Sequence, residues 1–130
     1  MENPKLNYVI ISDSAFFTKG SDTLNIIGIF DKIFAQNFPA VHSRIAFVAV
    51  FNGPKGKYRH KFLFKKEDLK ENLFEVDGEF EIPQDGAKAQ LVLNINNLVF
   101  QGSGKYVAEV YIDNALQDLK AIVEVELAQK

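Results

Sequence analysis

Few side chains in this sequence carry the chemistry of an active site. The chain has two histidines, His42 and His60, and no cysteine. Without cysteine there is no thiolate nucleophile, no cysteine-ligated zinc and no disulfide framework. Ser43 follows His42, but no nucleophile-elbow pattern and no third group accompany this pair. We therefore expect no catalytic residue, and the sequence favours a protein that is not an enzyme.

Metal and cofactor sites have equally little support. His60 lies on the apolar side of an alternating segment, which favours a packed, hydrogen-bonded histidine over a catalytic base. A calcium site needs roughly six to eight oxygen ligands. The aspartates at the expected strand ends lack the close Asp-x-Asp spacing that would supply these ligands: Asp13, Asp22, Asp31 and Asp113. We expect no metal and no cofactor.

The elements that position these residues are β-strands, and two of them carry complementary charged stripes. Each stripe alternates with apolar side chains, a period of two that is typical of a strand with one buried face. The basic stripe is Lys57, Arg59, Lys61 and Lys65, and the acidic stripe is Glu75, Asp77, Glu79 and Glu81. A hairpin centred near Lys70 predicts the pairs Lys65 with Glu75, Lys61 with Glu79, and Arg59 with Glu81. The stripes then neutralise each other and specify register more than they supply stability.

Turn residues divide the rest of the chain into further strands. The expected strands are Lys5–Ser12, Thr23–Phe34, Ser43–Phe51, Lys57–Lys65, Phe74–Ile82, Ala89–Asn96, Lys105–Ile112 and Ala115–Leu127. The helical candidates are a turn at Ser14–Thr18 and the charged connection Lys66–Glu71. Short strands at regular spacing predict an all-β fold, an antiparallel β-sandwich of about eight strands in a single domain over residues 1–130.

The last hairpin gives this predicted sandwich an immunoglobulin-like character. Asp113 and Asn114 tolerate the left-handed backbone of a two-residue turn. Tyr106 enters its strand after Gly104 and Lys105, as in the tyrosine corner of immunoglobulin-like sandwiches. In such a corner the ring hydroxyl bonds to an upstream backbone group. We therefore predict a hydrogen bond from Tyr106 to the backbone that precedes it.

Three segments resemble an uncharacterised prokaryotic family, classified as a domain of unknown function, of small β-sandwich proteins. They are the glycine-interrupted strand Leu24–Asp31, the corner Phe38-Pro39-Ala40, and the step Gly104-Lys105-Tyr106. The resemblance covers most of the chain and implies a small bacterial β-sandwich. Its motifs are structural, so it implies no catalytic residue and no mechanism.

The composition is that of an ordinary globular chain. The 130 residues are 47% hydrophobic and 25% charged, with a net charge of −2. This charge provides no general attraction to phosphate backbones, so we expect no nucleic-acid partner. The segment Met1–Lys5 lacks a secretory signal pattern, and the apolar run Ile45–Phe51 is too short to span a bilayer. Together with the absence of cysteine, these features predict a cytoplasmic protein with no membrane partner.

Surplus apolar side chains provide the strongest functional signal. In the final hairpin, the side opposite the expected core carries Val107, Tyr111, Leu116 and Ile122, and the strand at 43–51 carries Ala46, Val48 and Val50 opposite its core-facing set. One sandwich core cannot face both sides of a sheet, so either the chain itself or a partner covers such a surface. We predict a protein-binding or assembly module whose partner is another protein or a second copy, with the hairpin residues as its interface.

The alternative is a module that binds a small molecule or carbohydrate with the loops at one end. Carbohydrate sites rely on exposed aromatic rings. The chain has no Trp and four Tyr, and two of these, Tyr58 and Tyr106, alternate with the expected core residues. The sequence therefore favours the protein-binding function over the carbohydrate-binding one.

Overall fold

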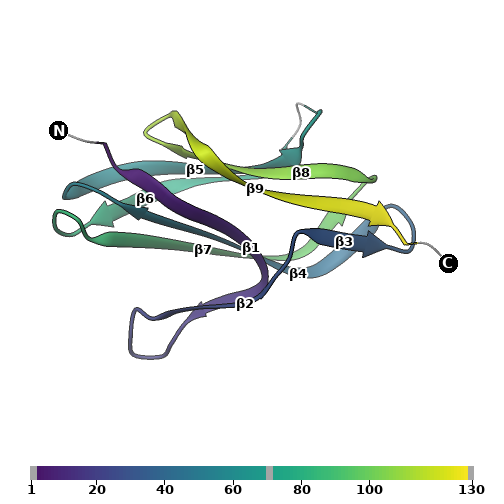
Figure 1. Ribbon diagram of the computed structural model, residues 1–130, viewed down its shortest axis with the longest axis horizontal. Helices are drawn as coiled ribbons and strands as arrows, with labels where there is room; N and C mark the ends of the chain where they lie inside the picture. Colours follow the sequence, from purple (N-terminus) through teal and green to yellow (C-terminus); the bar gives the residue numbers. More distant parts are fainter. Residues whose placement is uncertain (1–2, 70–71, 129–130) are drawn as a thin grey trace.

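The computed structural model describes residues 3–69 and 72–128, and these form nine β-strands and no helix. The strands are β1 (Lys5–Phe17), β2 (Leu24–Ile29), β3 (Lys32–Ala35), β4 (Ala40–Asn52), β5 (Gly56–Lys66), β6 (Asn72–Ile82), β7 (Lys88–Phe100), β8 (Gly104–Ile112) and β9 (Ala115–Leu127). One sheet has the order β2-β1-β4-β7, and the other has the order β3-β9-β8-β5-β6. In Figure 1 the five-stranded sheet lies above the four-stranded sheet. The predicted all-β class is confirmed.

The prediction of about eight antiparallel strands differs from the structure in two details. The segment Thr23–Phe34, expected as one strand, forms β2 and β3, because the chain leaves the four-stranded sheet after Ile29 and joins the other sheet at Lys32. There β3 runs parallel to β9, and the N–H of Glu124 donates to the carbonyl of Asp31 at 2.9 Å. The described residues therefore contain one strand more than expected and one parallel pair.

Neither helical candidate is found as a helix in the described residues. The turn expected at Ser14–Thr18 is wrong, because β1 continues to Phe17, which pairs with Leu24 of β2. The candidate Lys66–Glu71 includes residues 70 and 71, which lie outside the described residues. Within the described ranges, there is no helix of the length and apolar character needed to cross a membrane.

Aromatic side chains fill the space between the two sheets. The ring of Phe47 on β4 lies 5.5 Å from that of Phe62, 4.9 Å from that of Phe64 and 5.0 Å from that of Phe74. Phe51 stacks on Phe80 at 4.3 Å. Tilted and edge-on rings at these separations are favourable beyond their buried area. The alternation of β4, β5 and β6 therefore directs one face of each strand into a common aromatic core.

The hairpin of β5 and β6 keeps the predicted faces but shifts the register by two residues. Its cross-strand partners are Lys57 with Glu81, Arg59 with Glu79, Lys61 with Asp77, Phe62 with Val76 and Phe64 with Phe74. The predicted pairs Lys65 with Glu75, Lys61 with Glu79, and Arg59 with Glu81 are therefore wrong. A shift of two residues leaves every side chain on the same face. Both registers match opposite charges, so the charge pattern does not discriminate between them.

Two tyrosines hold the loops that precede β5 and β8 of the five-stranded sheet. The hydroxyl of Tyr106 donates to the carbonyl of Gly102 at 2.6 Å, which is the predicted bond to the upstream backbone. The hydroxyl of Tyr58 donates to the carbonyl of Pro54 at 2.8 Å, with the same spacing of four residues. Both bonds tie a loop to the strand that follows it. The β8–β9 turn also has the expected backbone, with φ of 46° at Asp113 and 69° at Asn114.

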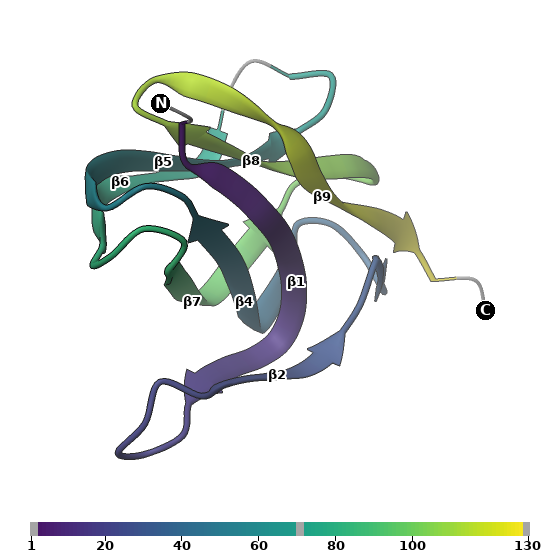
Figure 2. The same cartoon turned by 60° about the vertical axis from the view of Figure 1, so that its left-hand side comes forward.

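The four-stranded sheet curls at its β2 edge. Figure 2 shows β1 bending through its length and carrying β2 away from the rest of the sheet. Gly28 of β2 has a φ of 73°, and a Cβ at this position would collide with the carboxylate of Asp13. Glycine is therefore required where the two strands approach each other at the bend.

Candidate functional site

The four-stranded sheet carries apolar side chains on the face that points away from the five-stranded sheet. Four buried residues and four half-buried ones pack there as a cluster separate from the main core. Tyr8 and Phe17 join this cluster by register, because they lie opposite Val50 and Leu24. We call this set the outer apolar face: Tyr8, Ile10, Ala15, Phe17, Leu24, Ile26, Ala46, Val48, Val50 and Val92.

The outer apolar face is built from rows of side chains across neighbouring strands. Ile10 of β1, Val48 of β4 and Val92 of β7 form the central row. The strand β4 lies between β1 and β7 in the sheet. Its side chains Val48 and Val50 on this face are fully buried. The outermost members are half-buried or exposed, and Phe17 is 42% exposed.

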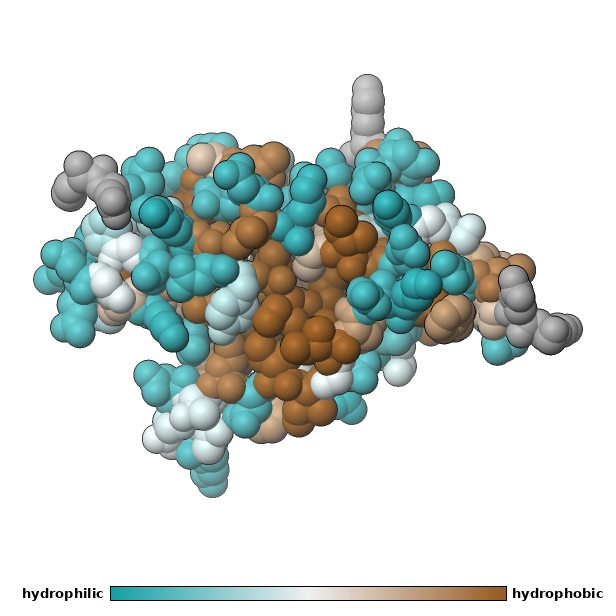
Figure 3. All heavy atoms as spheres, in the orientation of Figure 1, coloured by the Kyte–Doolittle hydropathy of each residue, from teal (hydrophilic) through white to brown (hydrophobic). Residues whose placement is uncertain are grey.

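The end of β1 curls over one end of this face. The side-chain amide of Asn94 on β7 donates to the carbonyl of Ala15 at 3.4 Å, across the position of Ala46 on β4. Figure 3 shows apolar side chains gathered over β1 and β2 in the middle of the view, bordered by polar residues. These two strands also carry exposed apolar side chains outside the outer apolar face, namely Phe16, Ile27 and Ile29. The central residues Ala15, Ala46, Val48 and Val50 are at most 2% exposed, so the middle of this face is covered within the chain itself. The accessible part of the outer apolar face is therefore its rim, where Tyr8 is 37% exposed and Phe17 is 42% exposed, and exposed apolar side chains of this kind can mark an interaction site.

The four residues predicted as an interface lie together on the outer side of the five-stranded sheet. They form two cross-strand pairs of β8 and β9, Val107 with Ile122 and Tyr111 with Leu116. Leu116 is 51% exposed and Ile122 is 42% exposed, whereas Val107 is only 3% exposed. Their role as an interface remains a prediction, and Val107 contributes little accessible surface to it.

Charged side chains border this second apolar surface. The amine of Lys61 lies 5.9 Å from the ring centre of Tyr111, within the range of a cation–π contact. The amine of Lys65 forms an ion pair of 3.2 Å with Glu109, which is itself buried between Val107 and Tyr111 on β8. The expected partner of Lys65 was Glu75, which instead lies 3.5 Å from Lys61. The side chains of Lys61 and Lys65 therefore lie against the border of this second apolar surface.

The two histidines lie on different sheets, and each packs against an aromatic ring. His60 is buried on the inner side of β5, as predicted, but its Nδ1 has no hydrogen-bond partner, so the expected hydrogen-bonded state is not found for that atom. Burial lowers the pKa of His60, and the nearby Asp77 carboxylate raises it by a smaller amount. His42 packs its ring 5.6 Å from that of Phe30. No side-chain hydrogen bond links His42 or Ser43 to a third group among the described residues.

The loop aspartates act as structural acceptors. Asp113 accepts a hydrogen bond from the backbone N–H of Arg59 at 2.9 Å, and Asp85 accepts one from the N–H of Lys55 at 2.8 Å. Among residues 3–69 and 72–128, no three His, Asp or Glu side chains come together as a metal site. Of the four aspartates at the expected strand ends, Asp113 therefore braces a turn with its side chain, as such residues commonly do.

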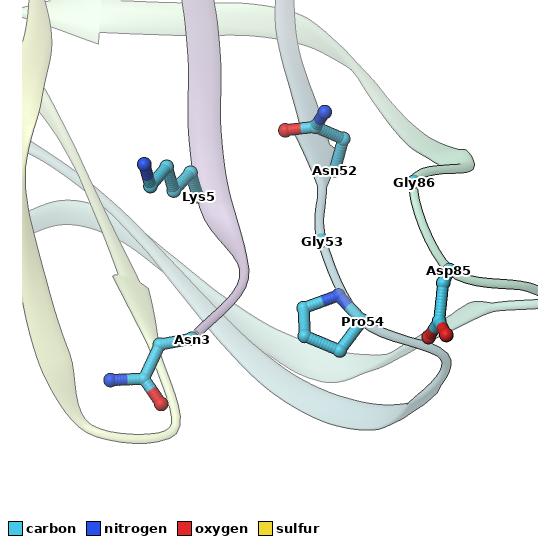
Figure 4. A pocket seen from close by; sticks show the side chains of 7 residues that line it. All are labelled: Asn3, Lys5, Asn52, Gly53, Pro54, Asp85 and Gly86. Atoms are coloured by element: carbon cyan, nitrogen blue, oxygen red, sulfur yellow. The ribbon is translucent and has the colours of Figure 1, made fainter. Parts of the chain in front are cut away.

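A polar hollow of about 460 Å³ lies at the end of the molecule where β4 ends and β7 begins. Figure 4 shows the side chains that line it: Asn3, Lys5, Asn52, Gly53, Pro54, Asp85 and Gly86. None of these side chains is aromatic. At the other end, a hollow of about 430 Å³ includes Tyr106, but its ring is buried and its hydroxyl is bonded to Gly102. Neither hollow presents the exposed ring that stacks on a sugar.

Sequence reasoning found the β4 members of the outer apolar face and missed those on β1 and β2. The missed residues include Tyr8, Ile10 and Ile26. A signal was present, because the run Tyr8-Val9-Ile10-Ile11 is apolar at every position, like the run Ile45–Phe51. A strand that is apolar on both faces indicates a second surface to be covered.

Two facing β-sheets with no helix in the described residues define an all-β protein. The model of DUF6941, a family of unknown function, matches residues 7–123, and the chain belongs to this family. The predicted membership of a domain-of-unknown-function family is thereby confirmed. No curated protein matches the chain.

A solved structure with a similar fold is the Pseudomonas fluorescens alkylpurine DNA glycosylase AlkC bound to DNA containing an abasic site analog. The TM-score is 0.53 at 10% sequence identity, and the match covers 95% of this chain and 30% of the glycosylase chain. The chain thus spans less than a third of that protein, and the likeness is one of fold. It nevertheless contradicts our expectation that nucleic acid is excluded as a partner. Net charge alone was the wrong basis for that exclusion, because this fold occurs within a protein bound to DNA.

Proposed function

We propose that this chain is a cytoplasmic, non-enzymatic protein-binding or assembly module that binds its partner with the outer apolar face. The observation that carries the proposal is the second apolar cluster on the four-stranded sheet, centred on Ile10, Val48 and Val92. A β-sheet that buries one face against a second sheet needs no apolar side chains on the other. The lack of cysteine supports the cytoplasmic assignment.

The proposed contact is apolar in the centre and polar at its border. Phe17 and Tyr8 at the rim are the exposed aromatic side chains of the outer apolar face. Aromatic side chains that become buried in a complex commonly carry much of its binding energy. We therefore propose these two as the anchors, with Ile10, Ile26 and Val92 providing the complementary surface. The Tyr106 corner also supports an immunoglobulin-like classification as part of this proposal.

The test compares Phe17→Glu on the outer apolar face with Leu116→Glu on the β8–β9 face. Both side chains are exposed, by 42% and 51%, so each substitution should leave the fold intact. Proteins captured by the wild-type chain are purified, and their binding is measured by calorimetry. We expect Phe17→Glu to weaken binding by about tenfold or more, in the range of hot-spot substitutions, and Leu116→Glu to have little effect.

Two other results would contradict this proposal. If Leu116→Glu abolishes binding and Phe17→Glu does not, the interface is the β8–β9 face formed by Val107, Tyr111, Leu116 and Ile122. If no purified protein binds and the chain binds abasic-site DNA in fluorescence anisotropy, the resemblance to the DNA-bound glycosylase extends to a ligand. The second result would replace protein binding as the proposed function.

A second candidate function is binding of a small polar molecule in the hollow near Lys5 and Asp85. The observation that favours it is the arrangement of an amine, a carboxylate and amides around one space of about 460 Å³. A ligand that binds only the folded state raises the apparent stability by mass action. A thermal-shift screen therefore tests this function, and a genuine ligand of the hollow should lose its effect in Lys5→Ala but not in Phe17→Glu.

A further inference from the structure

Among the described residues the two sheets have four edges, and each edge strand has backbone groups without a partner in its own sheet. The edges are β2 and β7 in the four-stranded sheet and β3 and β6 in the five-stranded sheet. Unpaired N–H and C=O groups along an edge form a template for another strand. Proteins that remain monomeric protect such edges with charge, short length or backbone irregularity.

Three of the four edges carry such protection. The strand β6 carries the acidic stripe of Glu75, Asp77, Glu79 and Glu81. If β6 paired with a second β6 about Gly78, Glu75 would oppose Glu81 and Asp77 would oppose Glu79. The strand β3 has only 4 residues, and β2 has 6 residues with Gly28 at a φ of 73°. These three edges are unsuited to self-pairing.

The fourth edge, β7, carries none of these protections over most of its length. It has 13 residues, and from Ala89 to Phe100 it contains no charged side chain. Its backbone is free of positive φ until Asn97, which has a φ of 57°. The inward side chains Leu91, Leu93 and Ile95 are only half-buried, although they pack against the main core. The regular part of this edge, residues 88–96, is therefore long, neutral and incompletely covered.

We propose that two copies of the chain associate by antiparallel pairing of β7 with β7, with the two-fold axis at Val92, the middle of residues 88–96. In this register Val92 faces the partner's Val92, Gln90 faces the partner's Asn94, and Lys88 faces the partner's Asn96. On the inner side, Leu91 faces the partner's Leu93. No two like charges meet, and the half-buried leucines gain apolar neighbours.

This association deepens the proposed function and rests on it, because it joins two outer apolar faces into one surface. The central row Ile10, Val48 and Val92 continues across the two-fold axis into the same three residues of the second copy. The two four-stranded sheets become one continuous eight-stranded sheet. A single two-fold contact of this kind closes on itself, which limits the assembly to a dimer.

The first experiment uses the absence of cysteine in the natural chain. In Val92→Cys, the only thiol lies on the proposed two-fold axis, next to its copy in the partner. The matched control is Glu79→Cys, on the free edge strand β6. Under mild oxidation at high protein concentration, we expect Val92→Cys to form a disulfide-linked dimer on a non-reducing gel and Glu79→Cys to remain a monomer. Equal cross-linking of the two variants would overturn the proposal.

The second experiment changes the charge opposite Lys88 without removing an apolar contact. Asn96 is exposed. In the proposed dimer, Asn96 of each copy faces Lys88 of the other copy, so this contact occurs two times. Sedimentation equilibrium should show a concentration-dependent dimer of the wild-type chain. We expect Asn96→Lys to weaken it about tenfold, since each dimer gains two like-charge pairs, and Asn96→Glu to strengthen it.

The outcomes separate this inference from the proposed function. A wild-type chain that stays monomeric at all concentrations overturns the β7 dimer and leaves partner binding through Phe17 intact. A dimer that dissociates equally in Asn96→Lys and Asn96→Glu uses another surface and also overturns it. A charge-dependent dimer that binds no partner would support the β7 pairing and count against the protein-binding function.

Discussion

At the scale of single residues, His60 has the least usual environment in the protein. Its ring is buried on the inner side of β5, opposite Gly78 of β6, and a Cβ on Gly78 would lie 3.0 Å from His60 Nε2. The ring therefore fills the space that a side chain at position 78 would occupy. Its Nδ1 has no hydrogen-bond partner. A proton added to this ring would place a positive charge in the core without a neutralising contact on that atom.

This environment predicts that the protein loses stability in mild acid. Burial lowers the pKa of His60 below its ordinary value of 6.5. Well above pH 6.5 the ring is neutral in both the folded and unfolded states, so it adds no pH dependence there. As the pH falls below 6.5, the unfolded chain binds the proton first, and the free energy of unfolding decreases until the folded pKa is reached.

Urea unfolding between pH 7.5 and pH 5 measures this effect. We expect His60→Gln to remove part of the decrease seen in the wild-type protein over that range. His42→Gln is the matched control for a histidine substitution, because His42 lies on β4 of the other sheet, where its ring packs against that of Phe30. If His60→Gln has the same pH profile as the wild type, the acid sensitivity arises elsewhere.

The sequence predicted the side of the strand on which His60 lies, but not the state of its nitrogen atoms. Alternation with Phe62 and Phe64 is a local property, and it correctly directs His60 inward. A hydrogen-bond partner depends on which strands face β5 across the core, and this depends on the fold as a whole. The bond from Tyr106 to Gly102 was predictable because both groups lie within four residues of each other.

At the scale of elements, the β5–β6 hairpin shows how far charge pattern determines pairing. Local alternation predicted both strands and the faces of their side chains, and the structure confirms them. In the observed register Phe64 faces Phe74, and their rings stack in the core with centroids 5.8 Å apart. A pattern with a period of two is satisfied equally by registers that differ by two residues. The break between β2 and β3 was missed for a related reason, since the whole segment Leu24–Phe34 has strand-forming composition.

A charge swap distinguishes the observed register from the predicted one. Lys61 faces Asp77 and forms an ion pair of 3.5 Å with the diagonal neighbour Glu75. We expect Lys61→Glu to lower the free energy of unfolding by about 0.2–1 kcal/mol at low salt, because it places three acidic groups together at the surface. Asp77→Lys in the same chain should restore most of this loss.

The control for the charge swap is Glu79→Lys in the Lys61→Glu background. Glu79 was the predicted partner of Lys61, but in the structure it faces Arg59. It should restore less stability than Asp77→Lys, as measured by urea unfolding at low and high salt. A better rescue by Glu79→Lys would mean that the hairpin pairs in the originally predicted register.

At the scale of the whole molecule, β4 joins two apolar clusters. Its residues Phe47 and Phe51 face the main core, and Val48 and Val50 face the outer apolar face. The continuous apolar run Ile45–Phe51 predicted this double burial from the sequence. The curl of β1, which covers the middle of the second cluster, could not be predicted in the same way, because it depends on the approach of Gly28 to Asp13 across two strands.

This arrangement predicts the order in which backbone amides exchange with solvent. The strand β4 is paired along both edges, to β1 and β7, and is buried on both faces, so its amides should exchange most slowly. The short edge strands β2 and β3 have few buried side chains and should open first. Hydrogen exchange followed by mass spectrometry measures these rates on overlapping peptides.

The amides of β7 give this experiment a second use. Half of them point away from β4, and in a monomer they should exchange faster than those of β4. In concentrated protein the proposed dimer pairs them, so protection of residues 88–96 should rise with concentration while that of β2 and β3 stays constant. Slow exchange of β7 that does not change with concentration would mean that the edge of β7 is already covered within one molecule. Fast exchange of β4 would mean that the outer apolar face does not stabilise the fold.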